Sequence, residues 1–361
     1  MNILILAKDS HVGGLVNCTD NLAQGLIKTH QANISIGITP SDAVEPLRKY
    51  NFYLIDFDTK NPLTVIKSYR LISKIVKEQQ IEIIHTQNRI PALYAAVYCF
   101  FHRRIKYIWA NHVVPIPSDF FHRITTRYGS LAVTEGLAGK KMLVEDFRIP
   151  EEKVRIINEG INLQHFKPIP KEEQVKLRNE IGVKEGEKLI LLYGRLAPIK
   201  GHLFLLDALK KVSPRSFKVV FPGEDHGEYI EQVRNKIKEG NLENNIIFPG
   251  YINGRDYLSI SDLMVLPSIN EGFPLSCVEA YSMGVPVIRT KTGGYEDTED
   301  MCFGVDYGDV DALSSLLNAF MSGDVEFRNM ALSAKENVKR LSLENMAEEY
   351  YAVYESIIEK K

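Results

Sequence analysis

Short runs of apolar and β-branched residues alternate along the whole chain with longer stretches whose apolar residues recur at the period of a helix. This alternation is typical of βαβ units and predicts an α/β protein built on doubly wound parallel sheets. In the first half of the chain, the expected strands cover residues 2–7, 33–39, 81–86, 105–112, 131–136 and 153–161.

A second series of strands follows KPIPKEEQ at residues 167–174, a proline-rich and charged stretch with the composition of a linker. The expected strands of this series cover residues 188–194, 217–223, 245–251, 262–268 and 285–291. The pattern therefore predicts two Rossmann-like domains, over residues 1–168 and 169–342, with a cleft at the carboxyl ends of both sets of strands. The length of 361 residues agrees with two domains.

The C-terminal segment, residues 342–361, is expected to form one long helix. Leu343, Met346, Tyr350 and Val353 recur there at spacings of three and four, which places them on one face. At the other end of the chain, MNILILAKDS is too short for a signal peptide or a membrane span, so we expect a buried first strand.

Four cysteines, Cys18, Cys99, Cys277 and Cys302, have neither CxxC spacing nor a neighbouring histidine. They predict free, mostly buried thiols in a reducing cytoplasm, and no metal site. The expected location of the protein is therefore cytoplasmic.

Charge is distributed unevenly between the two predicted domains. Residues 1–168 carry 21 Lys and Arg against 15 Asp and Glu, whereas the rest of the chain carries 23 against 31. The basic excess concentrates in FFHRRIKY and FFHRITTRYG, between Phe100 and Arg127. Aromatic pairs beside arginines fit a site that rests on an anionic membrane surface, at the inner face of the plasma membrane. They fit equally well a core of phenylalanines with solvated arginines.

A first candidate site is the loop AKDSHVGGLVNC, in which Gly13 and Gly14 precede an amphipathic helix. Paired glycines before a helix let backbone N–H groups approach a phosphate. The dinucleotide fingerprint GxGxxG is not matched, so a role in NAD binding loses its main support. A purely structural turn is the alternative.

A second candidate is LLYGRLAPIKGHLFLL. Arg195 and Lys200 lie on a loop tightened by glycine and proline, between a buried strand and a helix. A guanidinium fork and an ammonium charge presented from such a loop suit a pyrophosphate. The alternative is a solvated basic loop, which the position between two buried elements disfavours.

A third candidate is SINEGFPLSCVEAYSMGVPVI, residues 268–288. Pro274 suits the first turn of a helix that Gly284 ends. Glu271 precedes this helix, where a carboxylate is often only a favourable partner of the helix dipole. Glu279 lies inside the helix, about 8 Å along its axis. A buried carboxylate needs a partner, and ribose hydroxyls would serve.

A fourth candidate is His112, at the end of the expected strand IKYIWANH. A lone histidine after an apolar run is usually a satisfied core residue. Its position at the carboxyl end of a strand favours the cleft. His85, in IIHTQN, ends another strand and is the competing candidate.

These motifs occur in an order that resembles the retaining glycosyltransferases of family 4, which have the GT-B fold of two facing Rossmann-like domains with a deep cleft between them. The matching stretches are HVGGL, HTQNRIPALYAA, NEGINLQHFKP, YGRLAPIKG and NEGFPLSCVEAYSMGVPVI, the last being the E-x7-E signature. The resemblance covers essentially the whole chain.

The resemblance implies a role for each candidate. Arg195 and Lys200 would hold the donor diphosphate, Glu279 the nucleotide ribose and Glu271 a hydroxyl of the donor sugar. The amides of Gly272, Phe273, Pro274 and Leu275 would surround sugar and phosphate, to the extent that each has an N–H. His112 would lie by the transferred sugar, Gly13 and Gly14 near the phosphate and acceptor, and the backbone near Tyr251 against the base. The terminal helix, about 343–361, would cross back onto the first domain.

Two departures from the family pattern stand out. Where the family commonly reads PNG, this chain has Asn158, Glu159 and Gly160, which introduces a carboxylate. After TKTGG the usual glutamate is displaced into YEDTED, so Glu296 is a doubtful donor residue.

The expected function is therefore the transfer of a hexose from a nucleoside diphosphate sugar, UDP favoured, to a saccharide or lipid-linked acceptor, with retention of configuration. Such a reaction would serve the synthesis of a cell-surface polysaccharide, capsule, lipopolysaccharide or glycolipid. No cofactor and no metal are expected, because Arg195 and Lys200 supply positive charge and no DxD motif stands in a suitable place. Nucleic acid is not an expected partner. A soluble transferase with a small or protein acceptor, and an inactive GT-B partner subunit, are the alternatives.

Overall fold

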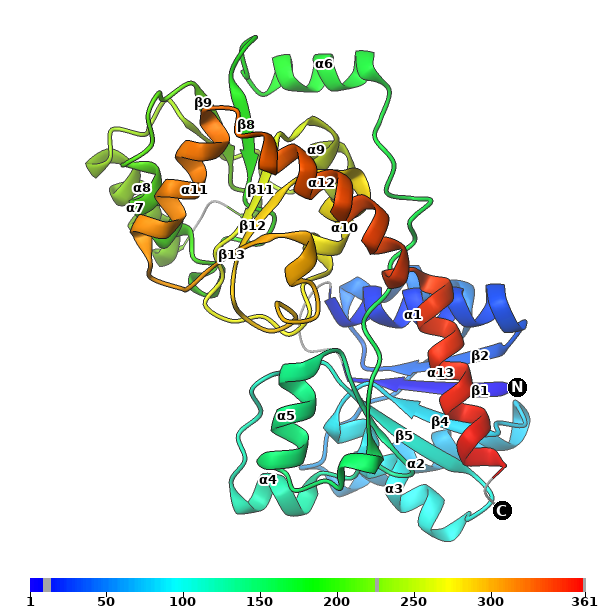
Figure 1. Ribbon diagram of the computed structural model, residues 1–361. Coiled ribbons are helices and arrows are strands. Elements are labelled where there is room, and N and C mark those ends of the chain that lie inside the picture. Colours follow the sequence, from blue (N-terminus) through cyan, green and yellow to red (C-terminus); the bar gives the residue numbers. More distant parts are fainter. Residues whose placement is uncertain (9–13, 225–226, 360–361) are drawn as a thin grey trace. The chain divides into compact units, whose positions relative to one another are not determined.

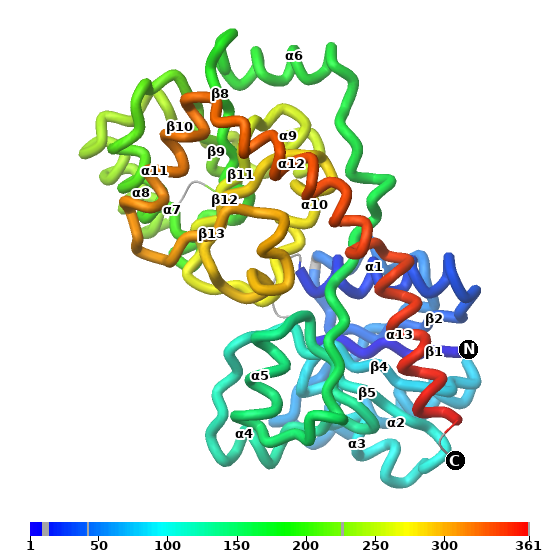
Figure 2. Tube along the Cα trace, in the orientation of Figure 1, coloured from blue at the N-terminus to red at the C-terminus, as the bar shows by residue number. Residues whose placement is uncertain are grey.

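The computed structural model describes residues 1–8, 14–224 and 227–359. The chain forms two compact units: unit 1 comprises Met1–Ile161 and Leu341–Lys361, and unit 2 comprises Asn162–Arg340. The chain enters unit 1 twice, as the blue-to-cyan and the red parts of the traces in Figures 1 and 2 show. The expected linker around residue 168 therefore belongs to unit 2.

Unit 1 contains a seven-stranded, wholly parallel sheet in the order β3-β2-β1-β4-β5-β6-β7. Its strands are β1(Asn2–Ala7), β2(Asn33–Ile38), β3(Asn51–Leu54), β4(Ile83–Thr86), β5(Lys106–Asn111), β6(Ala132–Thr134) and β7(Val154–Ile156). Its helices are α1(Gly14–His30), η1(Asp42–Lys49), α2(Pro62–Glu78), α3(Arg89–Phe101), α4(Phe120–Thr125), α5(Leu137–Glu145), η2(Glu151–Lys153) and α13(Leu343–Ile358).

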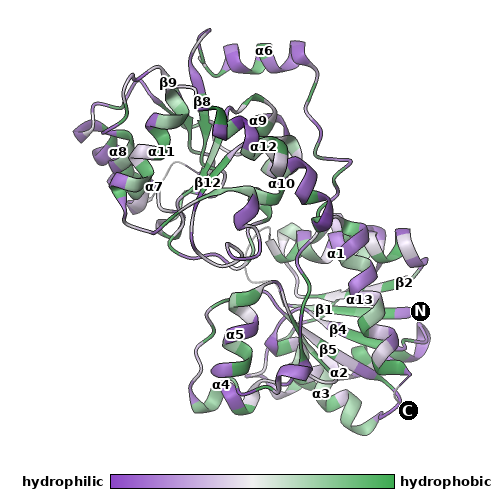
Figure 3. Ribbon diagram, viewed as in Figure 1, coloured by the Kyte–Doolittle hydropathy of each residue, from purple (hydrophilic) through white to green (hydrophobic). Residues whose placement is uncertain are grey.

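Both faces of this sheet are covered, which explains why its central strand is apolar at almost every position. Ile3 and Ile5 of β1 belong to a core that also contains side chains of α1 and α13. Leu4 and Leu6 point to the opposite face, into a core with residues of α2 and α3. A strand buried on both sides reads as a continuous apolar run because successive side chains alternate between two cores. Figure 3 shows β1 as hydrophobic accordingly.

The terminal helix α13 packs along α1, as Figure 1 shows. The four residues expected on one face, Leu343, Met346, Tyr350 and Val353, are all buried. Gly25 of α1 permits the close approach, because a Cβ there would lie 2.6 Å from the carbonyl oxygen of Leu343. The hydroxyl of Tyr354 also hydrogen-bonds Nδ1 of the buried His85 at 2.7 Å. Helix α13 is thus an integral part of unit 1.

Unit 2 contains a six-stranded parallel sheet in the order β10-β9-β8-β11-β12-β13. Its strands are β8(Lys188–Leu191), β9(Phe217–Val220), β10(Ile246–Ile247), β11(Leu263–Leu266), β12(Val287–Thr290) and β13(Phe303–Val305). Its helices are α6(Lys171–Glu180), η3(Pro198–Lys200), α7(His202–Leu209), α8(Glu228–Glu239), α9(Gly254–Ile260), α10(Leu275–Met283), η4(Glu299–Met301), α11(Val310–Met321) and α12(Val325–Asn337), and η5(Val338–Leu341) leads out of the unit.

The prediction of two parallel, Rossmann-like sheets is confirmed. Two edge strands, β3 and β13, were not expected from the sequence. Strand β3 is half exposed and β13 has only three residues, including Gly304, so neither carries a clear apolar run. The second half of the expected linker is helical, because Lys171 begins α6 directly after Pro170.

Among the described residues, no helix combines the length and the hydropathy that crossing a bilayer requires.

Candidate active site

In unit 2, Lys200 and Glu271 form an ion pair at the carboxyl ends of two neighbouring strands. Lys200 ends η3, which follows β8, and Glu271 follows β11. These strands lie side by side at the point where the strand order reverses, which is where doubly wound sheets bind ligands. Nζ of Lys200 lies 2.7 Å from Oε1 of Glu271, and the side chains are 20% and 11% exposed. The structure therefore brings together two of the predicted site residues.

The loop that carries Lys200 is held tightly against its neighbour. Gly201 has φ +73°, and a Cβ there would lie 1.9 Å from the carbonyl oxygen of Pro267. The amide of Ile269 also donates a hydrogen bond of 2.8 Å to the carbonyl of Ile199. A left-handed conformation and a backbone contact of this kind both require glycine at position 201. Lys200 is thus fixed in position by the β11 loop.

The Glu271 carboxylate has a second partner behind it. The hydroxyl of Ser268 donates to Oε1 of Glu271 at 2.5 Å, and the hydroxyl of Thr290 donates to the Ser268 carbonyl at 2.6 Å. The charge-assisted hydrogen bond from Ser268 fixes the direction of the carboxylate, and the bond from Thr290 holds Ser268 in place.

Helix α10 begins directly beyond Glu271, with Pro274 at its N-cap and Gly284, at φ +73°, at its C-cap. The stretch from Gly272 to Leu275 leads into its first turn, where backbone N–H groups have no intrahelical acceptor. Phe273 is buried, which anchors the entry to the helix. This N-terminus can therefore present amide donors to an anion next to Lys200.

Glu279 lies on α10, and its carboxyl group lies near the hydroxyl of Tyr193, the residue that follows β8 by two positions. Burial raises the pKa of Glu279 to about 8, although the nearby Tyr193 hydroxyl opposes the shift. Oε2 of Glu279 has no hydrogen-bond partner among the described residues. An acceptor that is buried and unpaired is a candidate ligand for a hydroxyl group.

Arg195 and Tyr251 lie on the loops after β8 and β10. Arg195 is exposed and makes no ion pair within the described part of the chain. Gly223 connects the two loops: its amide donates to the carbonyl of Gly250 at 2.8 Å, and a Cβ on it would lie 3.6 Å from Cα of Arg195. Tyr251 is exposed, and its hydroxyl donates to Glu224 at 2.7 Å.

Arg289, on β12, was not singled out from the sequence and is nearly completely buried. Its guanidinium donates to the carbonyls of Gly293 at 2.6 Å and Gly294 at 3.3 Å. Gly293 in turn packs on the loop of the predicted sugar-binding carboxylate, because a Cβ there would lie 2.2 Å from the carbonyl oxygen of Glu271. Arg289 therefore supports the backbone behind Glu271. Glu296, in the same region, is exposed.

In unit 1, the predicted glycine loop is described only in part. Gly13 lies outside the described residues, whereas Gly14 begins α1. A Cβ added to Gly14 would meet no described atom within 4 Å.

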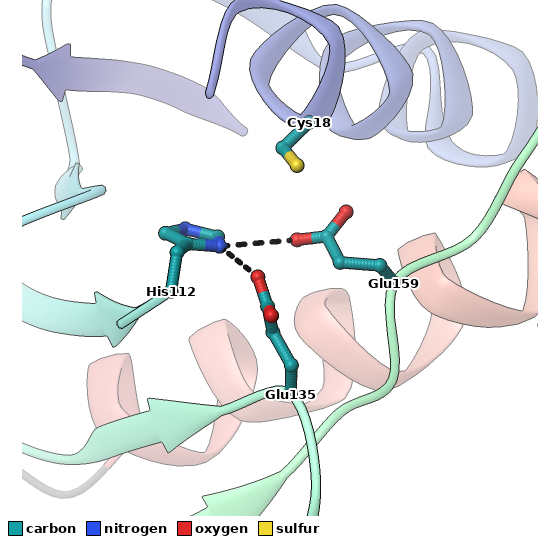
Figure 4. A group of neighbouring side chains, drawn as sticks. All are labelled: Cys18, His112, Glu135 and Glu159. Carbon is teal, nitrogen blue, oxygen red and sulfur yellow. Dashed lines mark hydrogen bonds and ion pairs between the residues drawn. The ribbon is translucent and has the colours of Figure 1, made fainter. Parts of the chain in front are cut away.

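His112, directly after β5, is held between side chains from three other segments (Figure 4). Its Nδ1 contacts Oε1 of Glu135 and lies 3.4 Å from Oε1 of Glu159, while its Nε2 contacts Oε1 of Gln87. The thiol of Cys18, on α1, faces the same group. The competing candidate, His85, is fully buried beneath α13. The structure therefore places His112 nearer the loops at the carboxyl edge and His85 in the core.

Burial and charge act against each other in this cluster. Burial opposes a charge on His112, but Glu135 and Glu159 outweigh it and raise the pKa of the imidazole. Burial and repulsion from Glu135 raise the pKa of Glu159 to about 7. For His85, burial lowers the pKa to about 3.

The segment between Phe100 and Arg127 forms part of the surface of unit 1. Phe100, Phe101, Phe120 and Phe121 are all between 67% and 78% exposed, so they do not belong to the core. Phe100 and Arg103, at the end of α3, line the same hollow as Thr126 and Arg127 after α4. Phe101 also borders an apolar groove between α2 and α3. Arginines and phenylalanines are thus exposed together.

Comparisons with known proteins agree with this fold. The model of Glycosyltransferase Family 4 matches residues 12–165, and the model of Glycosyl transferases group 1 matches residues 173–340. A solved glycosyltransferase of Rickettsia africae superposes with a TM-score of 0.89 at 24% identity, covering 100% of this chain and 99% of that one. The Anabaena protein HepE, solved in complex with UDP, superposes with a TM-score of 0.86 at 20% identity, covering 99% of this chain and 100% of that one.

Curated relatives point to the same class. An uncharacterised glycosyltransferase of Methanocaldococcus jannaschii is 31% identical over 47% of this chain and 45% of its own length. The UDP-Gal:alpha-D-GlcNAc-diphosphoundecaprenol alpha-1,3-galactosyltransferase of Escherichia coli is 26% identical over 63% of this chain and 62% of its own length. The alpha-monoglucosyldiacylglycerol synthase of Streptococcus pneumoniae is 26% identical over 80% of this chain and 70% of its own length. The matched segments thus span about half to two thirds of the first two relatives.

Fold and comparisons together define what the chain is similar to: its two units have the GT-B fold, and models of two glycosyltransferase families match residues 12–165 and 173–340.

Proposed function

We propose that the chain transfers a hexose from a nucleoside diphosphate sugar, preferably a UDP sugar, to a saccharide or lipid-linked acceptor, with retention of the anomeric configuration. The observation that carries this proposal is the Lys200–Glu271 pair at the switch point of the unit 2 sheet, in the same loop region as the exposed Arg195. The reaction would belong to the synthesis of a cell-surface polysaccharide or glycolipid, as the names of the Escherichia coli and Streptococcus pneumoniae relatives suggest.

The donor would lie along the carboxyl edge of the unit 2 sheet. Arg195 and Lys200 would bind the diphosphate, with the amides at the start of α10 beside them. Glu271 would accept a hydrogen bond from a hydroxyl of the sugar. Glu279 would accept hydrogen bonds from the ribose hydroxyls, since its Oε2 is buried and has no partner among the described residues. The backbone near Tyr251 would lie against the base.

His112, Gly13 and Gly14 are the residues of unit 1 that we assign to the reacting end of the donor. Both ring nitrogens of His112 are engaged by Glu135 and Gln87. A contact with the sugar through the ring therefore requires one of these partners to be exchanged, and Gln87, a neutral amide, is the easier one to replace. The catalytic set would then comprise His112, Arg195, Lys200 and Glu271.

Breaking the bond between sugar and diphosphate leaves negative charge on the phosphate and oxocarbenium character on the sugar. Positive side chains and helix amides aimed at the phosphate stabilise that charge most strongly where water is excluded. We propose that they do so without a metal ion at the diphosphate. Retention is usually achieved with a carboxylate nucleophile, but Glu271 is assigned here to a sugar hydroxyl. The acceptor would then attack from the side of the leaving group, whose phosphate oxygen takes the acceptor's proton.

The exposed aromatic and basic segment of unit 1 fits an acceptor embedded in a membrane. Phe100, Phe101, Phe120 and Phe121 would enter the interfacial region of the lipid, and Arg103 and Arg127 would face anionic headgroups. The protein would then work as a peripheral protein at the cytoplasmic face of the membrane.

Thermal-shift measurements against UDP-, GDP- and ADP-sugars test the donor. A ligand that binds only the folded state raises the melting temperature, and Lys200→Ala should abolish the rise caused by the correct donor. An undiminished rise in that variant would refute the phosphate role. Assignment of the product anomer by NMR tests retention, and an inverted product would overturn it.

Co-sedimentation with vesicles tests the membrane contact. Binding should require an anionic lipid, fall with added salt and decrease strongly in the double variant Phe100→Ser and Phe121→Ser. The matched control is the double variant Val325→Ser and Leu332→Ser, which replaces two apolar residues of similar exposure on α12 of unit 2. Equal binding of all three proteins would favour the alternative, a soluble transferase with a small or protein acceptor.

An inactive partner subunit is the other alternative. The intact group of Arg195, Lys200, Glu271 and Glu279 disfavours it, and sugar transfer by the purified chain alone would exclude it.

A further inference from the structure

A buried cluster in unit 1 gathers a thiol, an imidazole and two carboxylates that the proposed donor site does not use as a group (Figure 4). Cys18 lies on α1, His112 follows β5, Glu135 follows β6 and Glu159 follows β7. One ligand atom from each side chain lies within 4.8 Å of all the others. The cluster therefore joins four segments of the chain at the carboxyl edge of the sheet.

The spacing of these atoms is close to that around a small divalent ion. Bonds of about 2.0–2.3 Å to a tetrahedral zinc ion place the ligand atoms roughly 3.3–3.8 Å apart. Nδ1 of His112 lies 3.4 Å from Oε1 of Glu159. The contact between His112 and Glu135 is shorter than this, so the carboxylate of Glu135 must move outward by a small displacement to admit the ion.

The surroundings of His112 match those of a histidine that binds a metal ion. Its Nε2 contacts the side-chain oxygen of Gln87, which leaves Nδ1 to face the two carboxylates. Histidines that bind a metal almost always donate their other ring N–H to an oxygen in this way. The backbone near Glu135 is also fixed, because its carbonyl accepts a hydrogen bond of 2.6 Å from the Asn158 side chain.

Glu159 supplies an independent observation. It is 4% exposed, and its Oε2 has no hydrogen-bond partner among the described residues. A buried carboxylate oxygen without a partner is rare, because the lost hydration is not replaced. Glu159 is also the residue that departs from the sequence pattern PNG of the family. The departure thus adds an acidic ligand at the centre of the cluster, one of whose carboxylate oxygens has no hydrogen-bond partner among the described residues.

We propose that Cys18, His112, Glu135 and Glu159 bind one divalent metal ion, and that Zn²⁺ is the ion that suits this set best. Sulfur, nitrogen and oxygen ligands together favour zinc over magnesium or calcium, which prefer oxygen alone. On binding, the thiol of Cys18 and Nδ1 of His112 each release a proton to solvent, and the sulfur and the ring nitrogen then bond the ion.

Four protein ligands close the coordination sphere, so the ion has a structural role. It ties α1 to the ends of β5, β6 and β7, and it orients His112 while leaving Nε2 for Gln87 or for a sugar hydroxyl. All four ligands of the site belong to unit 1, whereas the proposed diphosphate ligands belong to unit 2.

Metal analysis of the full chain tests the proposal. The protein is stripped with a chelator, loaded with Zn²⁺ and freed of excess metal, after which we expect about one equivalent per chain and a higher melting temperature. Cobalt in place of zinc should give a thiolate charge-transfer absorption. The bound metal, the rise in melting temperature and the cobalt absorption should all be lost in Cys18→Ser and reduced strongly in Glu159→Asn.

Cys99→Ser is the matched control, because Cys99 is a free cysteine on α3 outside the cluster; it should keep the full metal content. Glu159→Asn restores the residue type common in the family, so it should fold even if Cys18→Ser does not. Zinc-loaded wild-type protein that retains no metal, or variants that retain all of it, would overturn the proposal. The cluster would then be a hydrogen-bonded group around a His112–Glu135 ion pair.

Discussion

Nζ of Lys200 and Oε1 of Glu271 lie 2.7 Å apart, although the two residues come from different loops. We assign one to the diphosphate and the other to the sugar of the same donor. In the structure the two side chains form an ion pair with each other, so neither partly buried charge is left without a partner. Donor binding must therefore exchange this contact for contacts with phosphate and hydroxyl groups.

This exchange predicts different effects for the two residues. Glu271→Gln should lower kcat with the sugar donor by about 10²–10³-fold, because a hydroxyl loses a charged acceptor in the transition state. It should leave binding of the free nucleoside diphosphate intact or tighter, since Lys200 no longer pairs with a carboxylate. Lys200→Ala should lose both sugar transfer and binding of the free nucleoside diphosphate. An assay of sugar transfer gives kcat, and calorimetric titration with UDP and UDP-sugar gives the binding of each ligand.

Lys211→Ala is the control for that experiment, because Lys211 pairs with Asp311 in an exposed ion pair outside the site. This variant should change neither kcat nor the binding of the nucleoside diphosphate. Equal losses of nucleotide binding in Glu271→Gln and Lys200→Ala would contradict the separate assignments.

Glu279 predicts a pH dependence of stability. Its pKa is about 8 in the fold against 4.5 in the unfolded chain, so the folded state holds the proton more tightly. Its contribution to the free energy of unfolding should therefore fall as pH rises from about 4.5 to about 8, by at most about 1.4 kcal/mol per pH unit. Glu279→Gln, which resembles the protonated form, should remove this fall.

Urea denaturation at about pH 5, 7 and 9 measures the difference between wild type and variant. The difference should change most below pH 8 and then level off. Parallel curves for the two proteins would show that Glu279 ionises normally in the fold.

Arg289 should matter for stability and for the donor site together. Arg289→Met leaves several buried carbonyls of the loop around Gly293 without donors, so unfolding should become easier by about 3 kcal/mol. The donor-induced rise in melting temperature should shrink, because Gly293 packs on the backbone of Glu271. Arg289→Lys should recover only part of the stability and only part of the donor-induced rise in melting temperature, since lysine lacks the planar fork of the guanidinium.

The control for Arg289 is Arg215→Met. Arg215 is exposed and donates to one carbonyl, that of Asn241, at 2.9 Å. We expect a change below about 0.5 kcal/mol and an unchanged donor effect. A normal donor effect in Arg289→Met would limit Arg289 to a role in the core.

Tyr354→Phe should loosen helix α13. Removing the hydroxyl leaves Nδ1 of His85 without its partner, while Nε2 already has none among the described residues. A buried polar group left unpaired costs about 1–3 kcal/mol. Urea denaturation gives the value, and Tyr351→Phe, on the same helix but only half-buried, should have little effect. Equal effects of the two variants would rule out the His85 contact as the cause.

Several features of the site were predictable because they depend on local sequence. Gly201, at the start of α7, and Gly284, at the end of α10, both adopt the left-handed conformation, and Pro274 lies at the N-cap of α10, directly before the first turn in which it was expected. The apolar face of the terminal helix was also correct. Such features follow from dihedral preferences and side-chain periodicity over a few residues.

Other features depend on segments far apart in the chain. Arg289 is a lone arginine in an apolar strand, and no neighbouring sequence feature indicates which carbonyls it binds. Cys18 and Glu159 are separated by most of unit 1, so cysteine spacing gave no sign of their proximity.

The sequence by itself determined two parallel α/β sheets, the positions of most strands and the loops that carry the candidate side chains. Only the tertiary structure decided which of these loops are neighbours, because strand order in a parallel sheet is set by packing between distant segments. Strand β8 lies beside β11, and that adjacency brings Lys200 to Glu271. The order of β4 to β7 likewise gathers His112, Glu135 and Glu159 beneath Cys18.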